Sequence, residues 1–111
     1  MKLIIAVVQD DDSDDLMEKI TSSGFRVTKL ATTGGFLRAG NTTLIIGLDE
    51  KDVDGVVKDI KEVCKKREQI IPASSGLSGT GTADGYTHYP VQVEVGGATV
   101  FVVDVDKFIR I

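Results

Sequence analysis

The sequence predicts an α+β protein with a ferredoxin-like βαββαβ sandwich and an additional C-terminal β-hairpin. Apolar runs typical of strands alternate with two segments of helical periodicity. The last two runs are joined by Gly96-Gly97, a pair typical of a two-residue hairpin turn. In this fold both helices pack on one face of an antiparallel sheet. We expect one domain over residues 1–111, because the chain has no internal repeat and no break in composition.

The first half of the chain contains three predicted strands and a helix. Leu3 to Val8 is a continuous apolar run, which is typical of a strand at the centre of a sheet. The acidic run at 10–13 offers N-cap residues and negative charge for a helix that we expect to stop at Gly24. The next two strands are predicted at about 25–33 and 41–48, with a turn region at 34–40 between them.

The strongest periodicity predicts a second helix, for which Asp49 is the expected N-cap. Its apolar residues follow the i, i+3, i+4, i+7 spacing of one helix face: Val53, Val56, Val57, Ile60, Val63 and Cys64. The remaining expected elements are a strand at 67–73, hairpin strands at 91–95 and 98–103, and one helical turn within 104–111.

Composition and charge limit the classes of partner. The net charge of −4 argues against non-specific binding to nucleic acid or to anionic membrane, both of which require a basic surface. The chain has no stretch of the roughly 20 apolar residues that a membrane span needs. Cys64 is the only cysteine, so no intrachain disulfide forms, and its apolar helix face predicts a core residue. We expect a cytoplasmic protein.

The sequence lacks the usual signatures of an enzyme or a metal site. It has no Walker-type loop and no dinucleotide-binding glycine pattern, and no nucleophile is paired with a base. The carboxylates at 10–12, 14 and 15 do not follow the spacing of a calcium loop, and His88 has no identifiable catalytic partner. We therefore expect a binding module without a metal or a cofactor.

One segment, at 25–43, combines the chemistry of a nucleotide site. It contains Arg26 and Arg38, the glycines at 34, 35 and 40, and an aromatic ring at Phe36. Glycines let backbone N–H groups approach an anion, arginines neutralise it, and the ring offers a stacking face to a base. The alternative interpretation is a plain hairpin turn at Gly34-Gly35, flanked by threonines that suit strands.

The segment at 25–43 resembles the corresponding segment of the PII-like cyclic-di-AMP receptor proteins of Gram-positive bacteria, and so do residues 1–10 and 89–102. The resemblance implies a PII-like homotrimer with its sheets facing inward. This agrees with the need to cover the apolar face of the sheet that the helices leave open. It also implies that cyclic-di-AMP binds between neighbouring subunits, and that loops then change conformation to signal to a protein partner that the sequence does not identify.

The resemblance also implies a set of ligand-binding residues. Arg26 and Thr28 would contact phosphate, ribose or a base edge, and Asn41 would hydrogen-bond an adenine. Gly47 would allow close backbone approach across the subunit interface. The turn that holds one adenine would consist of Gly35, Phe36 and Leu37, with Phe36 stacking on the base.

Three departures from the family pattern leave alternatives open. Gly24 stands where the family often has Asn, and Phe108-Ile109-Arg110-Ile111 replaces a usual Phe-His-Gln-Phe ending. The glycine-rich segment at 74–88, which we expect to be a mobile loop that ligand orders, also diverges. The alternatives are a PII-like sensor of ATP or ADP, and a structural or interaction trimer without ligand.

Overall fold

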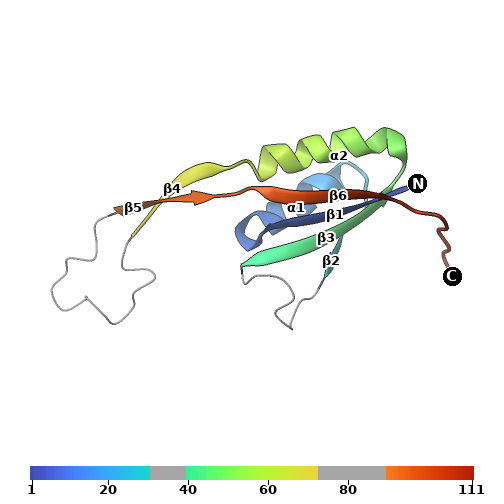
Figure 1. Ribbon diagram of the computed structural model, residues 1–111, viewed down its shortest axis with the longest axis horizontal. Helices are drawn as coiled ribbons and strands as arrows, with labels where there is room; N and C mark the ends of the chain where they lie inside the picture. Colours follow the sequence, from blue (N-terminus) through green and yellow to red (C-terminus); the bar gives the residue numbers. More distant parts are fainter. Residues whose placement is uncertain (31–39, 73–89) are drawn as a thin grey trace. The chain divides into compact units, whose positions relative to one another are not determined.

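The computed structural model describes residues 1–30, 40–72 and 90–111. Its order is β-α-β-β-α-β followed by two strands, which confirms the predicted α+β class (Figure 1). The elements are β1 (Lys2–Gln9), α1 (Asp10–Ser22), β2 (Thr28–Leu30), β3 (Asn41–Leu48), α2 (Glu50–Val63), β4 (Arg67–Pro72), β5 (Pro90–Val95) and β6 (Ala98–Asp104). They form two compact units, Met1–Lys65 with Gly96–Ile111, and Lys66–Val95.

The first unit contains an antiparallel sheet with the strand order β2-β3-β1-β6. β1 pairs along its length with β3 on one side and with β6 on the other. Ile5, for example, lies opposite Ile45 of β3 and Phe101 of β6. The continuous apolar run of β1 is therefore in the centre of the sheet, as predicted.

The predicted C-terminal hairpin is wrong. β5 pairs with β4 in a separate two-stranded sheet, whereas β6 pairs with β1, so β5 and β6 do not form a hairpin with each other. Gly96 and Gly97 both have positive φ angles, and their N–H groups bond elsewhere: Gly96 donates to Gln9 Oε1 at 2.8 Å and Gly97 to the carbonyl of Cys64. β6, and not the strand that follows α2, is thus the fourth strand of the sandwich sheet.

The second unit is a ribbon of two antiparallel strands. β4 and β5 pair in register from Arg67 opposite Val95 to Pro72 opposite Pro90. This confirms a strand after α2, although its partner is β5. The expected loop at 74–88 falls between these strands and lies outside the described residues.

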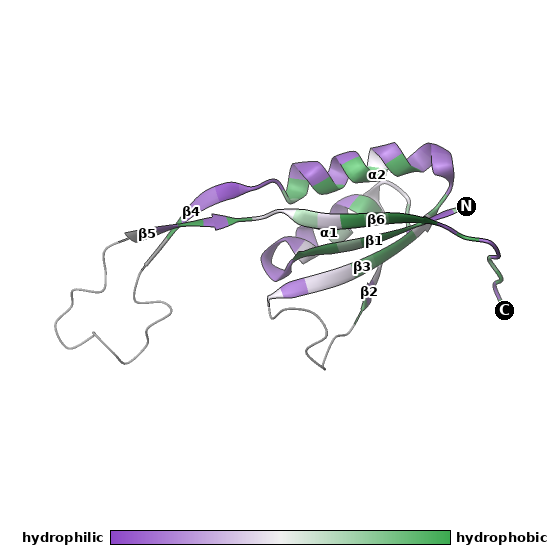
Figure 2. Ribbon diagram, viewed as in Figure 1, coloured by the Kyte–Doolittle hydropathy of each residue, from purple (hydrophilic) through white to green (hydrophobic). Residues whose placement is uncertain are grey.

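The hydrophobic core lies between the sheet and both helices. Alternate residues of β1 and β3 point to this face, and they pack against the apolar stripes of α1 and α2. Figure 2 shows hydrophobic residues along much of β1 and β6, and hydrophobic and hydrophilic residues alternating on α2. Cys64 is buried, as predicted. The core residues are Ile4, Ala6, Val8, Leu16, Ile20, Leu44, Ile46, Leu48, Val56, Ile60 and Cys64.

The helix ends agree in part with the sequence signals. Asp49 occupies the N-cap position of α2 without a side-chain capping bond. Gln9, rather than an acidic residue, occupies the N-cap position of α1. Asp10 is in the first turn instead, where its carboxylate accepts a hydrogen bond from Thr42 of β3. Gly24, with φ of +95°, follows the end of α1 as expected.

Two other boundaries differ from the predictions. In the described residues β2 covers only Thr28–Leu30, since the residues from 25 to 27 are not paired as a strand. The segment after Asp104 contains no helical turn and continues as irregular chain to Ile111. The described residues contain two helices, α1 and α2, and neither is long and apolar enough to cross a membrane.

The second face of the sheet is apolar and has no helix over it in the described part of the chain. Leu3, Ile5 and Val7 alternate with the buried residues of β1 and so point to this face. Their neighbours across the strands include Ile45, and also Phe101, which is 53% exposed. Among the described residues, this face is therefore an apolar surface that the helices leave open.

Replacement of Ile4 by Ala tests the core. Ile4 is fully buried in the central strand, so Ile4→Ala should lower the free energy of unfolding by about 2–5 kcal/mol, through lost burial and a cavity. Urea unfolding at a fixed protein concentration measures this difference. The control is Ile109→Ala, at a residue that is 73% exposed and should lose much less. Equal losses for the two variants would contradict this position of the core.

Candidate functional site

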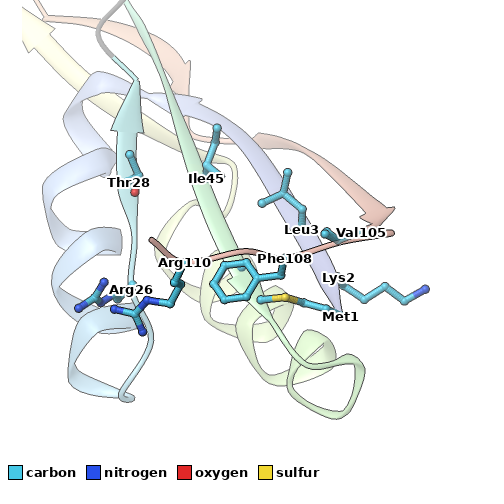
Figure 3. Close-up of a pocket in the computed structure, with 10 residues that line it drawn as sticks. Met1, Lys2, Leu3, Arg26, Thr28, Ile45, Val105, Phe108 and Arg110 are labelled. Atoms are coloured by element: carbon cyan, nitrogen blue, oxygen red, sulfur yellow. The ribbon is translucent and has the colours of Figure 1, made fainter.

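A cavity of about 450 Å³ opens in the first unit, where β1 begins and β3 ends. Its volume lies within the usual range for small-molecule pockets. Figure 3 shows side chains from the start of β1, from β2 and β3, and from the C-terminal segment around it. The residues that line it are Met1, Lys2, Leu3, Arg26, Thr28, Ile45, Gly47, Val105, Phe108 and Arg110.

Strand register explains one side of this pocket. Thr28 lies opposite Ile45, and Leu3 lies opposite Gly47, all on the sheet face away from the helices. Arg26 precedes Thr28 by two residues, just after the turn at Gly24 that ends α1. The N–H of Phe25 bonds to the carbonyl of Ile20, which fixes the entry of this segment into β2.

Gly47 leaves space at the pocket wall, although its backbone conformation does not require glycine. Its φ is not in the positive region, and it lies in a regular strand. A Cβ atom at this position would lie 3.5 Å from the Cε atom of Met1, an ordinary van der Waals contact. The absence of a side chain at Gly47 therefore widens the pocket. Neither a positive φ nor crowding in the core requires a glycine at this position.

The C-terminal segment forms another side of the pocket. The N–H of Val105 donates to the carbonyl of Met1 at 3.1 Å, extending the pairing of β6 with β1 by one residue. From this attachment the chain continues to Phe108 and Arg110, whose side chains both line the pocket (Figure 3). Arg110 stands at the position of Gln in the family's usual Phe-His-Gln-Phe ending.

The charges around the pocket are unbalanced. Lys2 is paired with Asp104, and its ammonium group points away from the other labelled side chains (Figure 3). Arg26 and Arg110 supply further positive charge, and no carboxylate is among the described residues that line the pocket. With the Thr28 hydroxyl and the apolar Met1 and Ile45, this arrangement suits a ligand that has an anionic group and an apolar body.

The structure brings together three of the sequence-predicted site residues and separates a fourth. Arg26, Thr28 and Gly47 line the same pocket. Asn41 lies opposite Gln9 at the other end of β3, six positions from Gly47, which is about 20 Å along a strand. Asn41 and this pocket are therefore apart within one chain. Gly35, Phe36 and Leu37 lie outside the described residues.

Several pocket residues were not identified from the sequence: Met1, Leu3, Ile45, Val105 and Phe108. The signal for two of them was present, since Leu3 and Ile45 belong to the outward-facing alternation of their strands. Among the described residues, no group of three or more His, Cys, Asp or Glu side chains is arranged to hold a metal ion.

Comparison with known proteins identifies the family. The family described as "Cyclic-di-AMP receptor" matches residues 1–111, the whole chain. The chain belongs to the cyclic-di-AMP receptor family. Membership of a receptor family indicates binding of cyclic-di-AMP and a role in signalling.

A solved structure has the same fold as this cyclic-di-AMP receptor family member. It is the crystal structure of a functionally unknown protein from Pediococcus pentosaceus, with 42% sequence identity and a TM-score of 0.77. The match covers 99% of this chain and 96% of that chain. It supports the fold, and it adds no function because that protein is itself described as functionally unknown.

The Lys2–Asp104 pair at the pocket edge should be visible in a titration. The hydrogen bond from Lys2 and its charge lower the pKa of Asp104, and the same hydrogen bond raises the pKa of Lys2. The ionised Asp104 should therefore stabilise the folded protein at pH values above the ordinary pKa of an aspartate. This stabilisation should be lost as pH falls through the lowered pKa of Asp104. NMR titration of the Asp104 carboxyl should give a pKa below the ordinary value, and Lys2→Met should bring it back. An unchanged value in Lys2→Met would contradict the pair.

Proposed function

We propose that this protein is a cytoplasmic receptor that binds cyclic-di-AMP in the pocket between β2, β3 and the C-terminal segment, and that it signals the bound state to a protein partner. The family match supports the choice of ligand. The observation that carries the choice of site is a pocket whose described lining residues include two arginines and no carboxylate, in a chain whose net charge is −4. Such local positive charge is expected for a site that holds phosphate.

Each part of the ligand has a chemical counterpart in the pocket. Arg26 offers a planar guanidinium group, which can donate two parallel hydrogen bonds to a phosphate. The Thr28 hydroxyl can donate to or accept from ribose or a base edge. The apolar wall that includes Leu3 and Ile45 offers contact to an adenine face. In this proposal the Gly35–Phe36–Leu37 turn supplies the stacking surface.

The proposed complete site contains residues from two subunits of a trimer. Asn41 and Gly47 lie at opposite ends of β3, so both can contact one ligand only when two chains meet. The open apolar face of the sheet, with Ile5 and Phe101, provides a reason for chains to associate. We therefore propose a homotrimer with cyclic-di-AMP at its subunit interfaces.

A second candidate ligand is ADP or ATP. Two arginines in one pocket are also suited to a chain of adjoining phosphates, and an adenine would use the same apolar wall. A cyclic dinucleotide has two bases and needs two base pockets, whereas a mononucleotide needs one. A trimer without ligand is the weaker alternative, because such a scaffold has no need of a cationic pocket.

Calorimetry with cyclic-di-AMP, cyclic-di-GMP and ATP tests this function. Cyclic-di-AMP should bind most tightly to the unmodified protein. Arg26→Gln should weaken it by about 1.5–3 kcal/mol, or roughly 10–100-fold, since a charged hydrogen bond is lost. The matched control is Lys29→Gln, which removes the same charge from β2 at a residue outside the pocket. Tighter binding of ATP, or equal effects of the two variants, would overturn the proposed ligand or site.

Light scattering tests the assembly. The unmodified protein should have about three times the 11.9 kDa mass of one chain. Phe101→Glu should shift the mass towards that of one chain, because it places an unpaired charge in the proposed interface at a cost of several kcal/mol. Lys51→Glu, which also adds negative charge but at an exposed position of α2, should retain the trimer. A single-chain mass for the unmodified protein would contradict the trimer.

A further inference from the structure

We propose that the exposed face of α2 around Gly55 is a docking surface for a second copy of this chain, with the two α2 helices side by side and parallel. A cavity of about 330 Å³ lies on this face, between α2 and the segment that follows α1. The surface belongs to the helix layer, and it shares no residue with the pocket proposed for the ligand. It therefore adds a contact that the proposed function does not use.

Gly55 is a glycine that the fold of one chain does not require. It lies in the middle of a regular helix, where glycine is less favourable than alanine. Its φ is not positive, its residue is exposed, and a Cβ atom added to it would meet no atom within 4 Å. The missing side chain instead leaves room for another backbone to approach this face of the helix closely.

Two rows of opposite charge flank Gly55 on the helix surface. Lys51 and Lys58, four residues before it and three after it, lie on one side. Asp52 and Asp59, three residues before it and four after it, lie on the other side. These four residues line the cavity together with Gly55. Among the ion pairs of the described residues, none includes a member of either row.

The two rows are complementary to themselves in a parallel arrangement. A two-fold axis along a pair of parallel helices places the lysine row of each copy opposite the aspartate row of the other. Lys51 then faces Asp52 of the second copy, offset by one residue or about 1.5 Å along the helix. Lys58 faces Asp59 of the second copy in the same way. An antiparallel pair would instead place lysine opposite lysine and aspartate opposite aspartate, so the charges select both the second copy and its direction.

The cavity suits the lysine side chains that a second copy would bring. Ser23 and Phe25 form its wall on the side of the segment after α1, and Phe25 also packs against the core. A lysine can lay its carbon chain along such an aromatic ring and keep its ammonium group beside a carboxylate. Asp52 and Asp59 are half-buried at this wall and offer the carboxylates. A contact about one helix wide is small, so we expect weak association that requires a high protein concentration.

The competing account is a solvated helix face. In that account Lys58 pairs along the helix with Asp54, four residues before it, and Gly55 has no role. Both residues are exposed, and no ion pair joins them in the structure. A solvated face gives no association through α2, so the two accounts predict different masses at high concentration.

Sedimentation velocity of the full chain tests the docking between about 10 µM and about 1 mM, which spans the dissociation constants of weak interfaces. In dilute solution the mass should be that of the assembly without the α2 contact, and it should rise about twofold or more at the concentrated end. Lys58→Glu should weaken this association about tenfold or more, because it places like charges together. The matched control is Lys61→Glu, an equal charge change on α2 outside the cavity, with an effect of less than about twofold.

Two further variants separate a specific contact from an effect of net charge. Asp59→Lys added to Lys58→Glu should recover the association, because the exchanged charges face each other again across the two copies. Asp54→Lys added to Lys58→Glu restores the net charge equally, and it should not recover the association. Gly55→Gln should raise the midpoint of thermal unfolding, since glutamine is the better helix former, and should still abolish the association by filling the space between the helices.

A mass that does not rise with concentration overturns the docking of a second copy and leaves this face to solvent or to a different protein. Equal effects of Lys58→Glu and Lys61→Glu, retained association in Gly55→Gln, or no recovery with Asp59→Lys also overturn it. Thermal unfolding of each variant checks that the folded fraction is the same. The proposed function is tested independently, because Phe101→Glu acts on the mass in dilute solution and Arg26→Gln on ligand binding.

Discussion

The pairing of β1 with β3 on one side and with β6 on the other is the constraint that positions the rest of the first unit. This register sets Gly47 beside Leu3 and brings the end of β6 beside the start of β1. It brings the start of β1 and the segment after β6 together at one end of these strands, and the pocket forms there. Neither segment has the length or the side chains to build such a pocket alone.

The helices cover only one of the two faces of this sheet. One face is sealed by α1 and α2, and its residues, such as Ile4 and Ile46, are fully buried. The other face has a similar apolar composition but no described helix over it, and Phe101 is half exposed. Apolar surface of this kind is costly to leave in water, and it gives chains a reason to associate.

Local patterns in the sequence were sufficient for the helices and most strands, because periodicity and glycine positions act over a few residues. They were not sufficient to choose pairing partners, which depend on packing between distant segments. Gly96-Gly97 is typical of a hairpin, yet β6 pairs with β1 and β5 with β4. For the site, the family resemblance supplied Arg26, Thr28 and Gly47, which the fold gathers in one pocket. Phe108 and Arg110 lie in a segment without periodicity, so only the three-dimensional structure places them there.

The hydrogen bond between Val105 and Met1 has a practical consequence for anyone who studies this protein. It holds the residue before β1 beside the segment after β6, so that Met1 and Arg110 line the same pocket. A charged or bulky group attached at Met1 or Arg110 would therefore lie beside the pocket and compete with a ligand. For the same reason, an environment-sensitive fluorophore attached at one of these residues would serve as a direct optical probe of pocket occupancy.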